Sequence, residues 1–240
     1  MIEELLIQLK LFGALEFYKQ HFEEKVDPQV FLQEMLRKEK ERRFIGAQKK
    51  RLLLAKFPYI KEWAQIDEAK NPLIPFKKVK KFSNGNFLGN KTNLCLIGTP
   101  GLGKTHCLVS IGRDLCRLGM NVKFYTACDL VNQLEEAKNN FGITKFMEGL
   151  LRPQLLIIDE LGFVPFSENG ARLLFDVFSK RYEKGSIAIS TNLSFEKWPQ
   201  IFGSIELTTA LIDRFTHNCE IFTFPGDSIR LEESKNRKKN

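Results

Sequence analysis

Residues 94–109 read "LCLIGTPGLGKTHCLV", an apolar run that enters a glycine-rich loop and leaves it in an amphipathic pattern. The spacing within it matches G-x-x-x-x-G-K-[ST], a phosphate-binding loop between a strand and a helix. Glycines let such a loop wrap closely and turn its N–H groups inward, and the following helix adds the positive end of its dipole. The sequence therefore predicts that one loop binds a nucleotide: Gly98, Thr99, Pro100, Gly101, Leu102, Gly103, Lys104 and Thr105.

A metal site is expected beside this loop. Lys104 can reach the β- and γ-phosphates, and Thr105 can offer its hydroxyl to Mg²⁺. In "LLIIDE", residues 155–160, an acid ends an apolar strand. Ligands of open α/β sheets bind at that edge of the sheet. Asp159 is therefore a candidate Mg²⁺ ligand, through water, with a simple strand cap as the alternative.

The acid that follows Asp159 bears on the reaction. Glu160 can polarise an attacking water. A kinase of small molecules need not carry this adjacent acid, whereas an enzyme that hydrolyses ATP needs a group that orients water. The pair therefore favours hydrolysis over transfer to a small acceptor.

Two later polar stretches supply further candidates. In "AISTN", residues 188–192, Asn192 can bond the γ-phosphate or the attacking water, although a polar turn explains the same residues. In "LIDRFTHN", residues 211–218, Arg214 can stabilise charge on a transferred phosphoryl group, often from a neighbouring subunit. From the residues alone, a surface arginine paired with Asp213 is favoured.

Short strands alternate with amphipathic helices after residue 93, which predicts a largely parallel sheet covered on both faces and an α/β fold. The candidate strands are 94–98, 121–126, 155–159, 186–191 and 219–224. The candidate helices are about 103–118, 128–139 and 169–184.

The front of the chain has a different character. Residues 1–66 are predicted to be helical, with a possible break near Gly46. Residues 67–90, rich in proline, glycine and asparagine, are expected to be a linker. One helix face is expected to gather several apolar side chains: Leu5, Leu9, Phe12, Leu15 and Phe22.

Charge points to a polyanionic partner. The net charge is +8, and residues 1–81 hold 18 Lys and Arg against 12 Asp and Glu. Such an excess favours nucleic acid, with a solvated helix face as the alternative.

Five cysteines without CxxC spacing are expected to be reduced thiols. The acidic start "MIEELL" does not fit a signal peptide, and no apolar run is long enough to span a membrane, so a cytoplasmic location is expected.

Five stretches together carry a family resemblance: "GTPGLGKTH", "LLIIDELGF", "RYEKGSIAISTN", "FEKW" and "ALIDRFTHN". Over about residues 5–231 the chain resembles the IstB-like ATP-binding proteins, which are AAA+ ATPases related to DnaC and DnaA. The resemblance implies a P-loop AAA+ core with a parallel five-stranded sheet flanked by helices. It implies that a small all-helical N-terminal domain, residues 1–66, binds DNA or a partner. Residues 67–90 would be a linker and the start of the ATPase module, and residues 91–231 the ATPase domain. Residues 232–240 would be a basic flexible tail.

The resemblance also implies residue roles. Lys104 and Thr105 are similar to Walker A, Asp159 and Glu160 to Walker B, and Asn192 to sensor 1.

Later positions match the family less evenly. Arg214 resembles the arginine finger that acts on a neighbour's ATP site, and Arg230 resembles a late arginine that contacts nucleotide. Residues 128–150, with Lys138 and Lys145, occupy the place of a helical insertion that helps contact DNA. Members often have two histidines after "DRL", and only His217 remains of that pair here.

The function implied by the resemblance is ATP-dependent help to a transposase. Subunits with ATP and Mg²⁺ would assemble as a homo-oligomer on duplex DNA, with ATP sites between subunits. A loader of the replicative helicase is a rival interpretation, which would favour single strands and use aromatic side chains for stacking. Aromatic residues are available for this, although their helical spacing favours core packing: Phe12, Phe17, Phe22 and Phe31. Two further functions are compatible with a phosphate-binding loop. One is a nucleotide-gated binding module with negligible hydrolysis, and the other is a small-molecule phosphotransferase.

Overall fold

The computed structural model describes residues 1–24 and 26–226, and the chain divides into two compact units at Arg51 and Leu52. Helix α3 (Pro28–Ala55) runs without a break across this boundary. The expected break near Gly46 is therefore wrong. A glycine within a helix costs only about 1 kcal/mol relative to alanine, and its neighbours here are good helix formers.

The first unit, Met1–Arg51, contains α1 (Ile2–Gln8), α2 (Phe12–His21) and most of α3. The buried carboxylate of Glu39 on α3 accepts hydrogen bonds from the N–H groups of Gly13 and Ala14, at 2.7 and 3.2 Å. Burial raises the pKa of Glu39, but the bonds from Arg43 and from α2 outweigh it and leave the pKa lowered. Glu39 thus fastens the start of α2 to α3.

The expected single apolar face in this unit is not formed. A turn at residues 9–11 separates α1 from α2, so their side chains do not share one helix face. Leu5, Leu9, Phe12 and Phe22 are 52%, 64%, 43% and 55% exposed. The local apolar spacing therefore did not identify the buried side of this unit.

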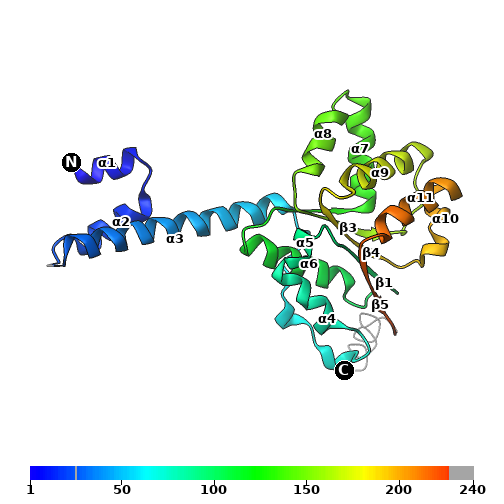
Figure 1. Ribbon diagram of the computed structural model, residues 1–240, viewed down its shortest axis with the longest axis horizontal. Coiled ribbons are helices and arrows are strands. Elements are labelled where there is room, and N and C mark those ends of the chain that lie inside the picture. The colour runs from blue at the N-terminus through cyan, green and yellow to red at the C-terminus, as the bar shows by residue number, and fades with distance from the viewer. Residues whose placement is uncertain (25, 227–240) are drawn as a thin grey trace, which may run out of the picture. The chain divides into compact units, whose positions relative to one another are not determined.

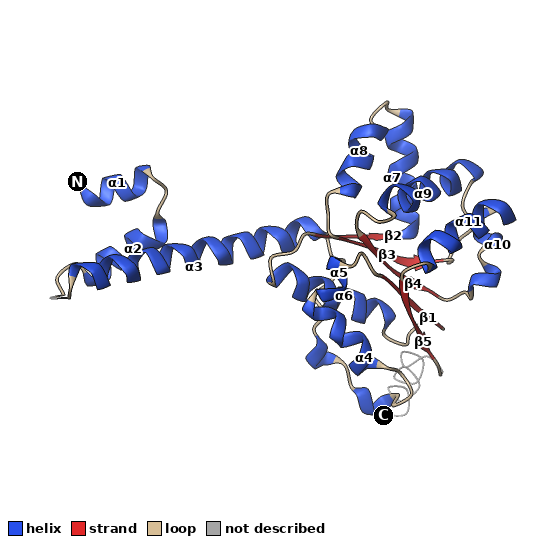
Figure 2. Ribbon diagram, viewed as in Figure 1, coloured by secondary structure: helices blue, strands red, loops and turns tan. Residues whose placement is uncertain are grey.

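The second unit is built on a five-stranded sheet in the order β2-β3-β4-β1-β5, and each recorded pairing is parallel (Figures 1 and 2). All five expected strands are confirmed. They are β1 (Asn93–Gly98), β2 (Val122–Thr126), β3 (Leu155–Leu161), β4 (Ser186–Thr191) and β5 (Cys219–Phe224). Because the strands are parallel, their carboxyl ends share one edge of the sheet and their amino ends share the other.

Helices cover both faces of this sheet (Figure 1). One face carries α4 (Phe76–Lys80), α5 (Asn86–Gly89) and α6 (Lys104–Arg117). The other carries α7 (Ala127–Asn139), α8 (Ile143–Leu151), α9 (Glu168–Arg181), α10 (Pro199–Phe202) and α11 (Ile205–Thr216). The three helices expected after residue 93 are confirmed as α6, α7 and α9, whereas α8, α10 and α11 had not been delimited from the sequence.

Alternation along the strands produces two cores. In β3, Leu155 and Ile157 join the core under α6, while Leu156 and Ile158 join the core under α7 and α9. Successive strand side chains point to opposite faces, and helices cover both, so the first four residues of the central strand β3 are all apolar and buried. This explains why β3 appears in the sequence as the uninterrupted apolar run "LLII".

The expected boundaries at the front of the second unit differ from the structure. The unit begins at Leu52, earlier than the expected domain of residues 1–66 would place it. Residues 67–90 are not an open linker, since Phe76, Val79 and Phe87 are buried in the core under α6. Short 3₁₀ helices occur at Trp63–Gln65, Glu68–Lys70, Lys81–Asn84 and Phe195–Lys197.

Within residues 1–24 and 26–226, no helix combines the length and the apolar character needed to cross a membrane.

Candidate nucleotide-binding site

The glycines of the loop between β1 and α6 stand where a side chain would either clash or strain the backbone. A Cβ on Gly98 would lie 2.4 Å from the carbonyl oxygen of Phe224 in β5. Gly101 and Gly103 have φ of +86° and +87°, in the left-handed region that favours glycine. Leu102, between them, is fully buried and anchors the loop in the core. The loop geometry therefore depends on each of these residues.

Lys104 opens α6 and lies within the loop. Its Nζ donates to the carbonyl oxygens of Gly98 and Thr99 at 2.6 and 2.8 Å, and the side chain is only 8% exposed. The hydroxyl of Thr99 donates to the Gly226 carbonyl at 3.0 Å. The ammonium group and the positive end of the α6 dipole thus act on the same small volume, which favours an anion.

Asp159 lies beside Thr105 at the carboxyl edge of the sheet. The Thr105 hydroxyl is 3.1 Å from Asp159 Oδ1, and the Ser190 hydroxyl bonds the same carboxylate oxygen. Burial raises the pKa of Asp159, partly offset by these two hydrogen bonds. A nearby cation would favour the charged carboxylate, and a hydroxyl with a carboxylate is a donor set suited to Mg²⁺. In the described ranges, no group of three or more His, Cys, Asp and Glu side chains is placed to hold a metal by itself.

The side chain of Glu160, near the end of β3, is exposed although most of the strand is buried. Its φ is +60°, unusual for a residue with a side chain, and its side chain is exposed at the cleft. Its N–H donates to the Ser190 hydroxyl at 3.0 Å. Ser190 therefore bonds the carboxylate of Asp159 and the backbone of Glu160, a role that sequence analysis missed. The sequence signal was the polar end of "AIST", residues 188–191, and in the structure the pairing of Ile158 with Ile189 places Ser190 beside Asp159.

Two neighbouring polar residues at the end of β4 differ in how buried they are. Thr191 is buried, and its hydroxyl accepts the Leu193 N–H at 3.1 Å, so it forms the turn after the strand. Asn192 is exposed and lines the same cleft as Glu160. The structure thus brings Asn192 and Glu160 to one cleft.

The cleft has a volume of about 660 Å³ and extends past the loop to a wall that sequence analysis did not assign. That wall belongs to the segment expected to end a helical domain and begin a linker. Alongside polar side chains it presents aromatic and aliphatic ones that suit a nucleoside: Tyr59, Ile60, Ile66 and Phe76.

Arg214 lies away from this cleft. It sits near the end of α11, ahead of β5, and lines a separate pocket of about 280 Å³ at the amino edge of the sheet. Its guanidinium donates to the Ser179 hydroxyl and lies 5.1 Å from the centre of the Phe175 ring. Among the interactions of the described residues, no hydrogen bond or ion pair joins Arg214 to Asp213.

Three other candidates have separate positions. His217 lines the amino-edge pocket with Arg214. Lys138 donates to the side chain of Asn169, and Lys145 is exposed on α8. Arg230 lies outside the described residues.

The parallel sheet, the glycine loop and the Thr105–Asp159 pair together define a P-loop protein of the AAA+ class. Solved structures support this fold. A DNA replication initiation factor matches with a TM-score of 0.58 and 23% identity, over 76% of this chain and 55% of that one. The DnaC helicase loader matches with a TM-score of 0.52 and 20% identity, over 73% of this chain and 99% of that one.

Sequence comparison gives the family. The model of the IstB-like ATP-binding proteins matches residues 5–237, and the chain belongs to that family. The ATP-binding protein of insertion sequence IS5376 from Geobacillus stearothermophilus is 37% identical, over 76% of this chain and 72% of its own length. That of insertion sequence IS21 from Pseudomonas aeruginosa is 30% identical, over 98% and 90%.

Proposed function

We propose that this protein is a DNA-binding AAA+ ATPase that assembles on duplex DNA with ATP and Mg²⁺ and assists a transposase. The observation that carries the proposal is the cleft lined by the glycine loop, Thr105 and Glu160, with the buried carboxylate of Asp159 bonded to Thr105. Family membership supports ATP as the nucleotide. The relatives are ATP-binding proteins of insertion sequences, which supports a role in transposition.

Each side chain in the cleft has a task in this proposal. The N–H groups of the loop and Lys104 bind the phosphates. Thr105 and Asp159 would hold Mg²⁺, which when bound neutralises charge developing on the phosphates. Glu160 orients the attacking water, and Asn192 bonds that water or the γ-phosphate. The exposed position of Glu160 leaves its carboxylate free of the buried strand for this purpose.

Arg214 acts on a neighbouring subunit in this proposal. It lines a pocket at the amino edge, which shares no residue with the nucleotide cleft at the carboxyl edge. An arginine finger supplied by another copy would explain this separation. ATP sites between subunits would also link hydrolysis to assembly.

A lysine cluster on the second unit is the strongest candidate surface for DNA. Residues 1–51 hold 11 Lys and Arg against 9 Asp and Glu, so most of the basic excess counted over 1–81 lies after Arg51. The core anchors α4 through Phe76 and Val79. Four exposed lysines gather on α4 and the residue after it: Lys77, Lys78, Lys80 and Lys81.

The lysine cluster is tested by replacing all four lysines with alanine. DNA affinity should fall, and the dependence of log K on log salt should lose about 0.9 for each phosphate contact removed. The matched control is Lys49→Ala with Lys50→Ala, which removes exposed lysines of α3. A larger loss in the control would assign DNA binding to the first unit.

Steady-state ATP hydrolysis without DNA, with single strands and with duplex, at one salt concentration, tests the function as a whole. Strong stimulation by duplex is expected, and Lys104→Ala should abolish nucleotide binding and turnover. Stimulation by single strands alone would favour the helicase loader, a function that the DnaC-like fold supports. A near-zero rate in all three conditions would favour a nucleotide-gated binding module.

A further inference from the structure

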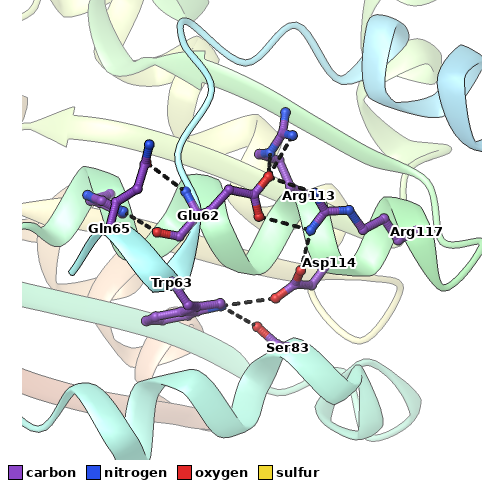
Figure 3. Close-up of polar contacts among 8 residues, drawn as sticks. Glu62, Trp63, Gln65, Ser83, Arg113, Asp114 and Arg117 are labelled. Atoms are coloured by element: carbon purple, nitrogen blue, oxygen red, sulfur yellow. Dashed lines mark hydrogen bonds and ion pairs between the residues drawn. The ribbon is translucent and has the colours of Figure 1, made fainter.

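Residues 57–67, which we call the strap, form one wall of the nucleotide cleft and lie against α6. Glu62 and Trp63, in the middle of the strap, point toward α6 (Figure 3). The strap therefore has one side facing the cleft and one side facing the helix that begins with Lys104. The cleft side consists of Tyr59, Ile60, Lys61, Gln65, Ile66 and Asp67.

Glu62 is held by two arginines of α6 (Figure 3). Arg113 donates to Oε1 from Nε and Nη2, at 3.1 and 2.8 Å. Arg117 donates to Oε1 at 2.6 Å and to Oε2 at 3.0 Å. The hydrogen bond from Arg117, followed by that from Arg113, outweighs burial and lowers the pKa of Glu62. Forked, charge-assisted bonds of this kind are strong and directional.

Trp63 adds a second attachment beside the first (Figure 3). Its indole Nε1 donates to Asp114 Oδ2 at 3.0 Å and to the Ser83 hydroxyl at 2.9 Å. Asp114 in turn accepts from Arg117 at 2.9 Å. The two attachments are therefore joined through α6.

Two further contacts fix the position of the strap along α6. His106 Nε2 lies 2.8 Å from the Glu62 carbonyl oxygen. At the start of the strap, a Cβ on Gly112 would come within 2.7 Å of the Phe57 ring, so Phe57 packs directly on the helix backbone. The strap is thus held at several points on the helix that carries the phosphate-binding residues.

We propose that Glu62 is a positioning residue of the nucleotide site: its ion pairs with Arg113 and Arg117 hold the strap as the wall against which the nucleoside binds. The inference rests on the proposed function, namely that a nucleotide binds in the cleft. The phosphates are bound by the loop of residues 98–105, which does not include the strap. Loosening Glu62 therefore weakens the hold on the nucleoside and leaves the hold on the phosphates.

The test compares ATP with inorganic tripolyphosphate, which has no nucleoside, as ligands of the full chain in the presence of Mg²⁺. In Glu62→Gln, the Kd for ATP should rise about tenfold, a loss of about 1.4 kcal/mol of binding free energy. The Kd for tripolyphosphate should not change, and in hydrolysis KM should rise while kcat at saturating ATP is kept. Arg117→Gln should give the same pattern if Glu62→Gln folds poorly.

A matched control removes an ion pair elsewhere in the same unit. Glu168 pairs with Arg172 at 2.6 Å on α9, outside the cleft. Glu168→Gln should leave both Kd values unchanged. Thermal unfolding without ligand would show whether either variant destabilises the fold.

Trp63 supplies a spectroscopic measurement of the strap. The chain has two tryptophans, and the other, Trp198, is fully buried. Acrylamide quenching should increase in Glu62→Gln and decrease again when ATP is added. Quenching identical to wild type would show that the strap is held without Glu62 and would overturn the proposal.

Two binding outcomes would also overturn it. Unchanged ATP affinity in both variants would show that Glu62 does not position the wall. Equal losses for ATP and tripolyphosphate would show that it supports the phosphate loop instead. If the wild-type chain bound tripolyphosphate with the same affinity as ATP, the strap would have no role in holding the nucleoside, and only the present proposal would be overturned. If the wild-type chain bound neither ligand, the proposed function would be overturned as well.

Discussion

The two edges of the sheet use charged residues in opposite ways. At the carboxyl edge, Asp159 is buried next to Thr105, and Glu160 is exposed in an open cleft. At the amino edge, Arg181 is buried and Arg214 is exposed. At each edge, a buried charged side chain thus accompanies an exposed one.

The enclosed charges differ in what surrounds them. Asp159 accepts hydrogen bonds from the hydroxyls of Thr105 and Ser190. Arg181 donates to main-chain carbonyl oxygens of Leu150, Pro153 and Ser186, at 2.6, 3.1 and 2.8 Å. Burial lowers the pKa of Arg181 to about 10, so it stays charged at neutral pH. The comparison teaches that burial alone does not identify a site: Asp159 is bonded to Thr105, which lines the nucleotide cleft, whereas Arg181 is bonded to main-chain carbonyl groups that join chain segments.

The largest effect, on the rate of ATP hydrolysis, is expected at Arg214, the exposed arginine of the amino edge. Arg214→Ala should lower ATP hydrolysis about a thousandfold, the lower end of the effect of an arginine finger, with ATP affinity unchanged. Mixing it with Lys104→Ala should restore part of the rate, because the Lys104→Ala subunit supplies Arg214 to an intact loop. Absence of rescue would contradict action between subunits.

The next largest effect on hydrolysis is expected at Glu160, the exposed acid of the carboxyl edge. Glu160→Gln should bind ATP but hydrolyse it roughly 300-fold more slowly, within the range for loss of a general base. Glu183 is a close control, since it is exposed, has φ of +58° and lies at the amino-edge pocket. Glu183→Gln should retain the wild-type rate. Equal losses in the two variants would remove the distinction between the edges.

Arg181→Met should affect stability and not the nucleotide. Leaving several buried carbonyl groups without their donor should lower the free energy of unfolding by about 3 kcal/mol, measured by urea denaturation. Arg172→Met, an exposed arginine of the same helix, should change it by less than about 0.5 kcal/mol. A small effect of Arg181→Met would show that the carbonyls find other partners.

The smallest effect concerns pH. Burial is the main cause that lowers the pKa of His106, opposed by its bond to the Glu62 carbonyl, with Lys61 lowering it and the Glu62 charge raising it. The folded state therefore binds fewer protons than the unfolded state below about pH 6.5, so stability should fall as pH drops below that value. His106→Gln should show a shallower decline in Tm between about pH 7.5 and 5.5. Identical slopes would contradict the shifted pKa.

The sequence was most informative where structure is local. Strand β3 follows from four consecutive apolar residues, and the loop follows from its glycine spacing. The meeting of Thr105 with Asp159 also followed, because parallel strands place their carboxyl ends at one edge.

Contacts between distant residues that no sequence motif marks were not predictable. Glu62 meets Arg113 and Arg117 across 51 and 55 residues, and nothing in its neighbourhood signals that pairing. The proline and asparagine content of residues 67–90 resembles a linker, yet tertiary packing buries Phe76 and Val79 there. In the first unit, apolar spacing indicated a face that the turn at residues 9–11 divides.

The order of the strands has a consequence for synthesis of the chain. Strand β1, which enters the phosphate loop, pairs with β4 and β5, and Gly98 lies beside Phe224. These partners leave the ribosome last among the strands, so the loop stays without its supporting neighbours until then. A nascent chain should therefore be unable to bind nucleotide before β5 has emerged, and during that interval the unpaired edges of β1 are exposed to aggregation or to chaperones.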